Sequence, residues 1–315
     1  MASSPISPKP PPNGSKSSLN PNVMSSLFDF EAKPDAYGVM GNPIAHSKSP
    51  QIHRAFAQQT GQNITYEAML VDAGGLEQAV GNFIAHGGKG LNITVPFKQD
   101  AWKLVDQRSQ RAALSGAVNT IIVNKDQTLT GDNTDGVGLV RDLTQNHGVT
   151  LKHSSILLIG AGGAARGVVE PLLNESPALL LIANRTSDRA YELAKTFSHL
   201  GNVTSCAFSA VEKHLPPDCV FDIIINATSA SLQGEVPDIP ASIITQESFC
   251  YDMMYGAQPT AFLRWADEHG GIRCVDGLGM LVEQAAESFF LWRGVRPETK
   301  AVIELIRAGL IKQSE

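Results

Sequence analysis

Residues 156–167 read Ile156-Leu157-Leu158-Ile159-Gly160-Ala161-Gly162-Gly163-Ala164-Ala165-Arg166-Gly167, an apolar run that meets a cluster of glycines and continues into a helix-compatible run. This order predicts a buried parallel strand, a tight turn and the start of a helix. The spacing G-x-G-x-x-A is an accepted form of the dinucleotide-binding fingerprint. Gly160 permits the turn, Gly162 lets a pyrophosphate approach the backbone, and Ala165 allows close packing of helix on strand. The alternative is a glycine-rich turn that binds nothing, because one fingerprint alone is weak evidence.

The next predicted strand, Ala178–Ala183, ends at the polar sequence Asn184-Arg185-Thr186. Proteins that select NAD usually carry Asp or Glu at this position, about twenty residues after the glycines. This chain has Asn184 and Arg185 instead, with Arg189 one helical turn further on. A guanidinium group binds phosphate through two parallel hydrogen bonds, which suits the 2′-phosphate of NADP. We therefore predict NADP rather than NAD, the alternative being that the arginines, with Asp188 between them, begin a solvated helix.

The composition is that of an ordinary globular protein, with 315 residues, 43% hydrophobic and 18% charged. This length is enough for two domains. The formal net charge is −6 and the chain has no basic block. Composition therefore indicates neither nucleic acid nor an anionic membrane as a partner, and no apolar run is long enough to span a bilayer. We expect a cytoplasmic protein, monomeric or homodimeric, that acts on a small molecule.

Four cysteines are present, at positions 206, 219, 250 and 274. They form no C-x-x-C pair, and no histidine lies at metal-ligand spacing from them. Cys206, Cys219, Cys250 and Cys274 are therefore expected to be free thiols in a reducing compartment, and no metal site is predicted.

Residues 1–35 are poor in apolar residues and rich in Ser, Pro, Asn and Lys, which predicts a disordered tail. The tail lacks the apolar segment of a secretory signal, and its lack of arginine makes it a poor transit peptide. Met24 is a second candidate for the start of the chain.

Order is expected to begin near Ala36, with a strand over Tyr37–Met40, a polar loop and a helix over Gln51–Gln59. Ser49 is expected to cap this helix, with Pro50 at its first position. Ser47 has no such structural duty. Two hydroxyl groups at a helix N-terminus could bind a small carboxylate.

A further strand over Gly90–Pro96 leads into Phe97 and Lys98. Open α/β sheets bind ligands at the carboxyl ends of their strands, where Lys98 and Thr94 are expected. The alternative for Lys98 is an ordinary solvated loop residue. A helix is predicted over Leu104–Leu114. Further strands are predicted over Ile64–Val71, Val118–Val123 and Leu129–Gly131, and a helix over Leu76–His86.

Polar residues crowd the segment Asp132–Gly136, before a predicted helix over Val137–Asn146. Turn chemistry explains such a cluster, but the segment also precedes the glycine fingerprint and so marks a domain boundary, where sites are favoured. Strands over Phe221–Thr228 and Phe249–Met253 continue an alternation of strands and helices, which predicts a parallel sheet covered on both faces. Closing helices are predicted over 278–292 and 299–311. Gln284 in the first of them needs hydrogen-bond partners, which could be a ligand or a neighbouring carbonyl.

Taken together, these segments resemble the shikimate dehydrogenase family, in family order over residues 36 to about 313. Each motif is weak alone, but the ordered set is specific. The matching motifs are 41–50 (GNPIAHSKSP), 92–98 (NITVPFK), 116–120 (GAVNT), 131–136 (GDNTDG), 160–164 (GAGGA), 184–186 (NRT), 226–228 (NAT), 251–255 (YDMMY) and 276–285 (DGLGMLVEQA).

The resemblance implies an α/β protein of two domains. The first, residues 36–135, would bind the substrate and be completed by the helices of residues 278–315. The second, residues 136–277, would be a Rossmann-like NADP domain with a doubly wound, mainly parallel sheet. The implied reaction is the reversible, NADPH-dependent reduction of 3-dehydroshikimate to shikimate, on the route to chorismate and the aromatic amino acids.

The resemblance also implies roles for individual residues. The substrate carboxylate would be held by Ser47, Ser49 and Tyr255. The ring hydroxyls would be bound by Thr94, Lys98, Asn119, Asp135 and Gln284. The cofactor would be lined by Gly160, Ala161, Gly162, Gly163, Ala164, Asn184, Arg185, Thr186, Arg189, Met253 and Gly277. Because negative charge grows on the ketone oxygen, a cation or proton donor must meet it, and Lys98 oriented by Asp135 fits this need.

The chain departs from the family pattern at Gln110, where an acidic residue is common before the arginine, and in its long tail. One alternative is a quinate/shikimate dehydrogenase with relaxed cofactor use, which an acidic residue before Asn184 would have favoured. The other is a non-catalytic sensor of NADP or a metabolite, which loss of Lys98 or Asp135 would have supported.

Overall fold

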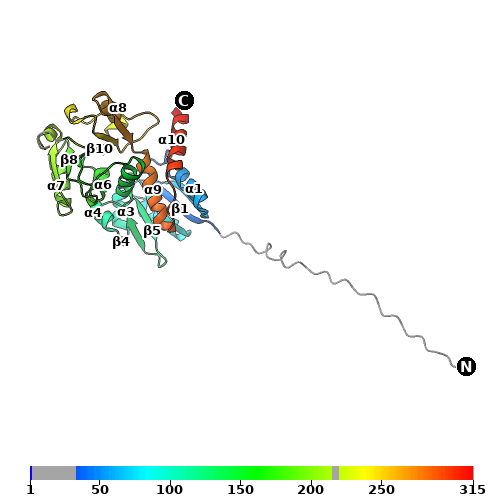
Figure 1. Cartoon of the computed structure of the whole chain (residues 1–315). Coiled ribbons are helices and arrows are strands. Elements are labelled where there is room, and N and C mark those ends of the chain that lie inside the picture. Colours follow the sequence, from blue (N-terminus) through cyan, green and yellow to red (C-terminus); the bar gives the residue numbers. More distant parts are fainter. Residues whose placement is uncertain (2–32, 215–219, 315) are drawn as a thin grey trace. The chain divides into compact units, whose positions relative to one another are not determined.

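The structure, a computed structural model, describes Met1, residues 33–214 and residues 220–314 (Figure 1). Nearly all of the predicted tail, and Cys219, lie outside these residues. Cys206, Cys250 and Cys274 are free thiols. Within the described part of the chain, no helix combines the length and apolar character needed to cross a membrane.

The first sheet is mixed and has the strand order β2-β1-β3-β5-β6-β4. Its strands are β1 (Asp35–Gly41), β2 (Ile64–Leu70), β3 (Gly88–Ile93), β4 (Gln107–Arg108), β5 (Thr120–Val123) and β6 (Leu129–Asp132). β5 runs antiparallel to both β3 and β6, whereas the other pairs are parallel. The helices among these strands are α1 (Ser49–Thr60), α2 (Leu76–Ala85), α3 (Lys98–Leu104) and α4 (Gln110–Ser115).

The second sheet is wholly parallel and has the order β12-β11-β10-β7-β8-β9. Its strands are β7 (Ser155–Ile159), β8 (Leu179–Asn184), β9 (Val203–Ala207), β10 (Ile223–Asn226), β11 (Phe249–Asp252) and β12 (Arg273–Asp276). The helices among them are α6 (Gly163–Asn174), α7 (Ser187–Phe197) and α8 (Ala261–Glu268), with 3₁₀ turns η4 (Phe208–His214), η5 (Ala230–Gln233) and η6 (Ala241–Ile243). The strand order reverses between β7 and β10, as in a doubly wound Rossmann sheet, so the predicted fold class is confirmed. The exact domain bounds stay a prediction.

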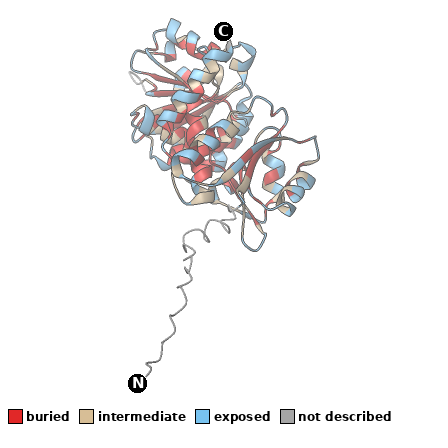
Figure 2. Cartoon of the chain, turned by 90° about the vertical axis from the view of Figure 1, so that its right-hand side faces the viewer, coloured by how far each residue is buried: buried red, intermediate tan, exposed pale blue. Residues whose placement is uncertain are grey.

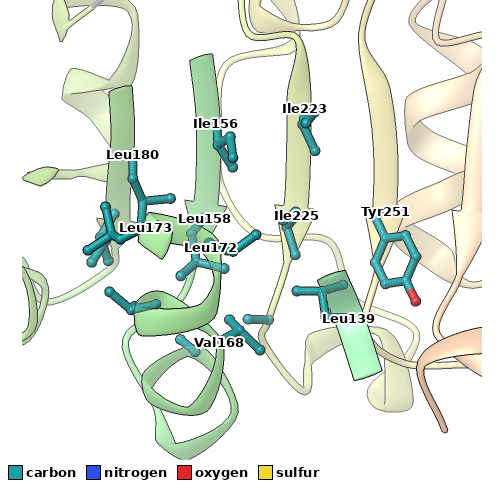
Figure 3. Close-up of a cluster of buried hydrophobic side chains, with 14 of the residues drawn as sticks. Leu139, Ile156, Leu158, Val168, Leu172, Leu173, Leu180, Ile223, Ile225 and Tyr251 are labelled. Carbon is teal, nitrogen blue, oxygen red and sulfur yellow. The ribbon is translucent and has the colours of Figure 1, made fainter. Parts of the chain in front are cut away.

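Alternate residues of the central strands enter two separate cores, one on each face of the second sheet. Ile156 and Leu158 of β7 pack with Leu172 of α6 on one face (Figure 3). Their neighbours Leu157 and Ile159 pack on the opposite face. Because both faces are covered, the strand is apolar at every position, which is why it reads as a continuous run in the sequence. Buried residues accordingly follow the strands, whereas exposed residues lie on the outer helices (Figure 2).

The two last helices, α9 (Leu278–Arg293) and α10 (Lys300–Ser314), pack with α1 around a shared apolar core. Ile52 and Phe56 of α1 meet Phe289 of α9 and Ile306 of α10 there. The C-terminal helix therefore lies beside the first helix of the described chain (Figure 1).

Helix α5 (Asp135–Arg141) packs closely against both α6 and α9 through two glycines. A Cβ atom on Gly136 would lie 2.5 Å from the carbonyl oxygen of Gly167 in α6. A Cβ atom on Gly138 would lie 2.8 Å from the backbone nitrogen of Gln284 in α9. Real Cβ contacts are essentially never this short, so glycine is required at both positions for the backbones to approach.

The helix predicted over Val137–Asn146 is longer and less regular in the structure. It begins at Asp135, is α-helical to Arg141 and continues as a π-helix, η3 (Asp142–Asn146). Asp142 at this change is fully buried and accepts a hydrogen bond from the Tyr251 hydroxyl at 2.6 Å. Burial, together with the charge of Asp142, raises the pKa of Tyr251, so its hydroxyl stays protonated as the donor.

The helix predicted over Leu104–Leu114 is wrong, because the chain breaks there to pair with β6. The backbone N–H of Asp106 donates to the Leu129 carbonyl at 3.0 Å, and its carboxylate accepts the Leu129 N–H at 2.7 Å. Ser109 then caps a new helix, α4, by accepting the N–H of Ala112 at 3.2 Å. Sheet pairing with a distant strand outweighs the helical pattern of the local sequence.

At Gln110, where the chain departs from the family pattern, the side chain is exposed and α4 begins. The next residue, Arg111, holds the Asp132 carboxylate through two nitrogens at 2.7 and 2.8 Å and also contacts Glu287 at 3.1 Å. The ion pairs at this point are therefore made by Arg111. Within the described residues, Gln110 makes no contact that takes the place of an acidic side chain at this position.

Replacing Gly138 by alanine tests the close packing of α5. Overpacking of this kind typically costs about 1–3 kcal/mol, so Gly138→Ala should lower the free energy of unfolding by roughly that amount. Gly81, inside α2, has no atom within 4 Å of its Cβ direction and is the matched control. Gly81→Ala should stabilise by about 0.5–1 kcal/mol, because alanine is the better helix former. Chemical denaturation measures both, and a stabilised Gly138→Ala variant would refute the close contact.

Candidate active site

A central pocket of about 310 Å³ lies where the loops after β1, β3, β11 and β12 meet helices α1, α5 and α9. Ten of the residues named from the sequence line it: Ser47, Ser49, Thr94, Lys98, Asn119, Asp135, Met253, Tyr255, Gly277 and Gln284. These residues lie as far as 237 positions apart in the chain (284 against 47), and folding brings them to one cavity. Their individual roles remain predictions.

Lys98 and Asp135 form an ion pair at the edge of the central pocket. The Lys98 ammonium lies 2.6 Å from Oδ2 of Asp135, and the two side chains are 29% and 15% exposed. Each is the first residue of its helix, α3 and α5. A lysine at a helix N-terminus is opposed by the helix dipole, whereas an aspartate is favoured there, so the pair offsets the unfavourable charge of Lys98.

Lys98 also lines a second cavity, which contains the glycine turn and which we call the glycine-turn cavity. The lysine therefore stands between the pocket that contains Ser47 and Tyr255 and the cavity that contains Gly162. A group placed there can contact molecules bound on both sides.

Asn119 orients Asp135 through a hydrogen bond to its carboxylate. Its amide nitrogen donates to Oδ1 of Asp135 at 2.8 Å and to Thr134 Oγ1 at 2.9 Å. Its carbonyl oxygen accepts the backbone N–H of Thr134 at 2.9 Å and the hydroxyl of Thr120 at 2.8 Å. Because both amide hydrogens have short partners, a ligand hydroxyl would have to replace one of them.

Gln284 reaches the same cluster from α9. Its side-chain nitrogen donates to the Leu281 carbonyl at 2.8 Å, within its own helix. Its oxygen lies 3.4 Å from both Asn119 and Thr134, at the long limit of a hydrogen bond. The partner of the half-buried amide nitrogen is thus a neighbouring carbonyl, the alternative to a ligand, although its second hydrogen stays available.

The structure corrects the expectation that Ser49 caps helix α1. The N-cap is Lys48, and no side chain caps this helix. Instead the Ser47 hydroxyl accepts the backbone N–H of Ser49 at 3.3 Å. The loop closes back on itself at this point, so Ser47 rather than Ser49 makes the side-chain contact to the backbone, and both serines line the central pocket.

Tyr255 lines the central pocket together with Ser47 and Ser49. Burial raises the pKa of its hydroxyl, and the charge of Asp276 raises the pKa further. The hydroxyl therefore stays protonated as a hydrogen-bond donor. Two serines, one tyrosine and a helix N-terminus form a donor-rich lining for an anionic group.

Asn92 lines the pocket but was not named as a site residue, although it opens the motif at residues 92–98. It accepts the Tyr66 hydroxyl at 2.7 Å and donates to Ser288 at 3.0 Å. Its polar side-chain atoms are hydrogen-bonded within the protein, so Asn92 connects α9 to the sheet. The sequence signal was present, but nothing in it distinguished a supporting asparagine from a ligand-binding one.

The glycine turn has the geometry that the fingerprint requires. Gly160 has a φ of +110°, a backbone conformation that residues with a side chain rarely adopt. A Cβ atom on Gly162 or Gly163 would meet nothing within 4 Å. The open space in front of them belongs to the glycine-turn cavity, of about 810 Å³. Helix α6 begins at Gly163, so its free N–H groups point toward this space. This arrangement fits the phosphates of a dinucleotide.

Arg166 and Arg189 add two cations to the glycine-turn cavity, beside the carboxylates of Asp188 and Glu192. Arg166, in the first turn of α6, was not named from the sequence, although it lies only three residues after Gly163. A basic group next to the turn is consistent with a phosphate ligand.

Asn184 and Arg185 line a different cavity, of about 550 Å³, together with Thr228 and Ser229. The two arginines proposed for one phosphate, Arg185 and Arg189, therefore line separate cavities in this structure. The Asn184 side chain donates to the Thr186 carbonyl at 2.9 Å and so shapes the turn. Gly160 and Thr186 are not among the lining residues of the central pocket or of these two cavities.

Met253 and Gly277 both line the central pocket and lie next to each other. A Cβ on Gly277 would lie 2.3 Å from the Met253 carbonyl oxygen, so only glycine allows this approach. Within the described part of the chain, no group of three His, Cys, Asp or Glu side chains could hold a metal ion.

Three family models match the chain in order. Residues 39–121 match the shikimate dehydrogenase substrate-binding domain, residues 142–234 match shikimate/quinate 5-dehydrogenase, and residues 277–307 match the shikimate 5′-dehydrogenase C-terminal domain. These matches cover most of the first sheet, strands β7 to β10 of the second sheet, helix α9 and part of α10.

Known proteins resemble the chain over most of its length. It is 55% identical over 274 residues to the shikimate dehydrogenase (NADP(+)) of Nitrosococcus oceani, covering 87% of this chain and 95% of that one. Among solved structures, an Ael1 enzyme from Pseudomonas putida has a TM-score of 0.81 at 44% identity, covering 86% and 97% of the two chains. Shikimate 5-dehydrogenase from Thermus thermophilus, solved with NADP(H) and shikimate, has a TM-score of 0.77 at 31% identity, covering 88% and 100%. From the matched domains, the identity and the shared fold, this chain belongs to the shikimate dehydrogenase family.

Proposed function

We propose that this protein is an NADP-dependent shikimate dehydrogenase, an oxidoreductase that acts on a CH–OH group. It reduces 3-dehydroshikimate to shikimate reversibly, on the route to chorismate and the aromatic amino acids. The observation that carries the proposal is the Lys98–Asp135 pair, held at 2.6 Å between the central pocket and the glycine-turn cavity. A pocket for an anionic polyol on one side and a phosphate-binding turn on the other are what this reaction needs.

The substrate carboxylate binds at the donor-rich end of the central pocket. Ser47, Ser49 and Tyr255 supply hydroxyl donors, and the N-terminus of α1 adds a favourable dipole. The ring hydroxyls meet Thr94, Lys98, Asn119, Asp135 and Gln284 at the other end. Because the Asn119 amide is already satisfied, it acts chiefly by holding Asp135, whereas Gln284 has capacity to spare.

Lys98 serves as the proton donor in the direction of reduction. When bound, the reduced cofactor supplies the hydride that the ketone carbon receives. Negative charge then grows on the ketone oxygen, where the Lys98 ammonium stabilises it and transfers a proton. Asp135 fixes the ammonium through the 2.6 Å contact, and in the reverse direction the neutral amine accepts the proton. No part of this step requires a metal ion.

The cofactor is held at the C-terminal edge of the second sheet. The turn 160–164 and the N-terminus of α6 fit the pyrophosphate, and Asn184, Arg185, Thr186 and Arg189 are proposed for the 2′-phosphate end. Met253 and Gly277 line the central pocket together with Lys98. This supports a binding position in which the reacting end of the cofactor lies next to Lys98. Arg185 shares its cavity with Asn184, whereas Arg189 lines the glycine-turn cavity. The loss of Arg185 should therefore distinguish NADP from NAD most directly.

Cofactor choice is the first test of the proposal. Shikimate and quinate are each assayed with NADP and with NAD, and shikimate with NADP should give the highest kcat/KM. Arg185→Ala should lose about 1.5–3 kcal/mol of transition-state binding with NADP, the range for a hydrogen bond to a charged group. It should lose little with NAD, and Arg264→Ala, an exposed arginine on α8, should change neither. Equal losses with both cofactors would remove Arg185 from the 2′-phosphate site.

Replacing Lys98 by alanine tests the proton donor. General acid–base catalysis typically contributes about 10²–10⁴-fold, so Lys98→Ala should lower kcat by roughly that factor. The KM for shikimate should change far less, because the contact is made mainly in the transition state. Lys103→Ala is the control, since this exposed lysine lies on the same helix and also has an aspartate partner, Asp100 at 3.8 Å. A Lys98→Ala enzyme with more than about a tenth of the kcat, where chemistry limits turnover, would assign the proton to another group.

Removing the Ser47 hydroxyl tests the carboxylate site. Ser47→Ala should raise the KM for shikimate and leave kcat nearly unchanged, because the carboxylate is remote from the reacting carbon. A lost charge-assisted hydrogen bond corresponds to a rise on the order of tenfold or more. Ser198→Ala, an exposed serine at the end of α7, should have no effect. An unchanged KM in Ser47→Ala would leave this hydroxyl with only its backbone contact to Ser49.

A further inference from the structure

Arg307, in the C-terminal helix α10, reaches two loops that border the central pocket. One of its terminal nitrogens donates to the Gly256 carbonyl at 2.8 Å and to Oδ2 of Asp276 at 2.8 Å. Its other terminal nitrogen contacts Oδ1 of Asp276, which makes the pair bidentate. One guanidinium thus ties the loop after β11 to the junction of β12 and α9.

Asp276 depends on this arginine. Its side chain is only 7% exposed, and its carboxylate also accepts the Leu278 N–H at 3.2 Å, at the start of α9. Among the described residues, Arg307 supplies its ion pair. A nearly buried carboxylate that loses its cationic partner carries a large desolvation penalty and an unbalanced charge.

The two loops held by Arg307 carry residues of the pocket wall. Tyr255 precedes Gly256, and Gly277 follows Asp276, so each anchoring point is adjacent to a lining residue. The loops also contact each other directly, because the Gly277 N–H donates to the Met254 carbonyl at 3.1 Å. A shift of either anchoring point would therefore move the Tyr255 side chain.

Charge adds to this geometric effect. The carboxylate of Asp276 is close enough to act on the Tyr255 hydroxyl, whose pKa is raised first by burial and then by that charge. A bound anion next to Tyr255 would experience the same negative charge. The guanidinium of Arg307 pairs with both oxygens of Asp276 and so offsets this charge.

We infer that Arg307 is a positioning residue for the anionic group of the substrate. It holds the Gly256 carbonyl so that Tyr255 keeps its place in the pocket lining that it shares with Ser47 and Ser49, and it neutralises Asp276 so that the pocket tolerates a carboxylate. The inference rests on the proposed function, because it requires an anionic substrate at the Tyr255 end of the pocket. Arg307 lines none of the central pocket itself, so it acts through Asp276 and Gly256.

The test compares steady-state kinetics of four full-length proteins with shikimate and NADP. They are the wild type, Arg307→Met, Asp276→Asn with Arg307→Met, and Arg293→Met. Arg293→Met is the matched control, since Arg293 pairs with Asp35 at 2.5 Å and neither residue lines the pocket. Arg307→Met should raise the KM for shikimate on the order of tenfold, with a much smaller change in kcat. The double variant should recover most of this rise, to within about threefold of wild type, because the unbalanced charge is gone.

Each outcome decides the inference. If Arg307→Met and Arg293→Met have the same KM for shikimate and lose the same thermal stability, Arg307 is purely structural. That result would overturn the inference. A double variant as impaired as Arg307→Met, or more so, would overturn the charge argument. If Arg307→Met does not fold, the folded double variant and Arg307→Lys, which keeps the charge, replace it. A raised KM in both would overturn the charge argument, because neither variant leaves Asp276 unbalanced, and would leave the hydrogen bond to the Gly256 carbonyl as the cause. A wild type that does not oxidise shikimate would refute the proposed function, and the inference would fall with it.

Discussion

The close approach of helix α5 to α6 and α9 is the constraint on which the site depends. Gly136 lets α5 contact the backbone of α6, and Gly138 lets it contact the backbone of α9. Helix α5 begins with Asp135, α6 begins at the glycine turn, and α9 carries Gln284. One short helix therefore sets the distance between the Lys98–Asp135 pair, the glycine turn and the Gln284 amide. A side chain at either glycine would separate all three.

Polar groups around Asp135 are paired before any ligand arrives. Asn119 and Lys98 each hold one oxygen of the Asp135 carboxylate, at 2.8 and 2.6 Å. Preorganised groups of this kind need no rearrangement when charge develops in the transition state. The same principle extends to the wall behind Tyr255, where Asp276 is balanced by Arg307. The pocket thus keeps its fixed negative charges paired, which suits an anionic substrate.

Much of the site could be predicted from local patterns. The glycine turn, Lys98 after its strand and the Ser47–Ser49 loop each follow from strand ends and helix starts, where ligands bind in open α/β sheets. Asn92 was not named because its motif does not show which polar side chains are hydrogen-bonded inside the protein. Arg166 was not named although it lines the glycine-turn cavity. The Ser49 cap was wrong because the loop folds back and Ser47 takes the N–H instead. Local preference cannot foresee such a closure.

The sequence by itself determined the alternation of strands and helices, the glycine turn and the preference for a phosphate-bearing cofactor. These features depend on residue spacing within a few turns of chain, so they can be recognised locally. The tertiary structure decided which side chains meet: Lys98 with Asp135, Arg307 with Asp276, and Arg185 apart from Arg189. It also broke the helix predicted over 104–114, because Asp106 pairs with Leu129 in a later strand. Contacts between distant segments depend on how the elements pack, and packing is determined by the whole chain.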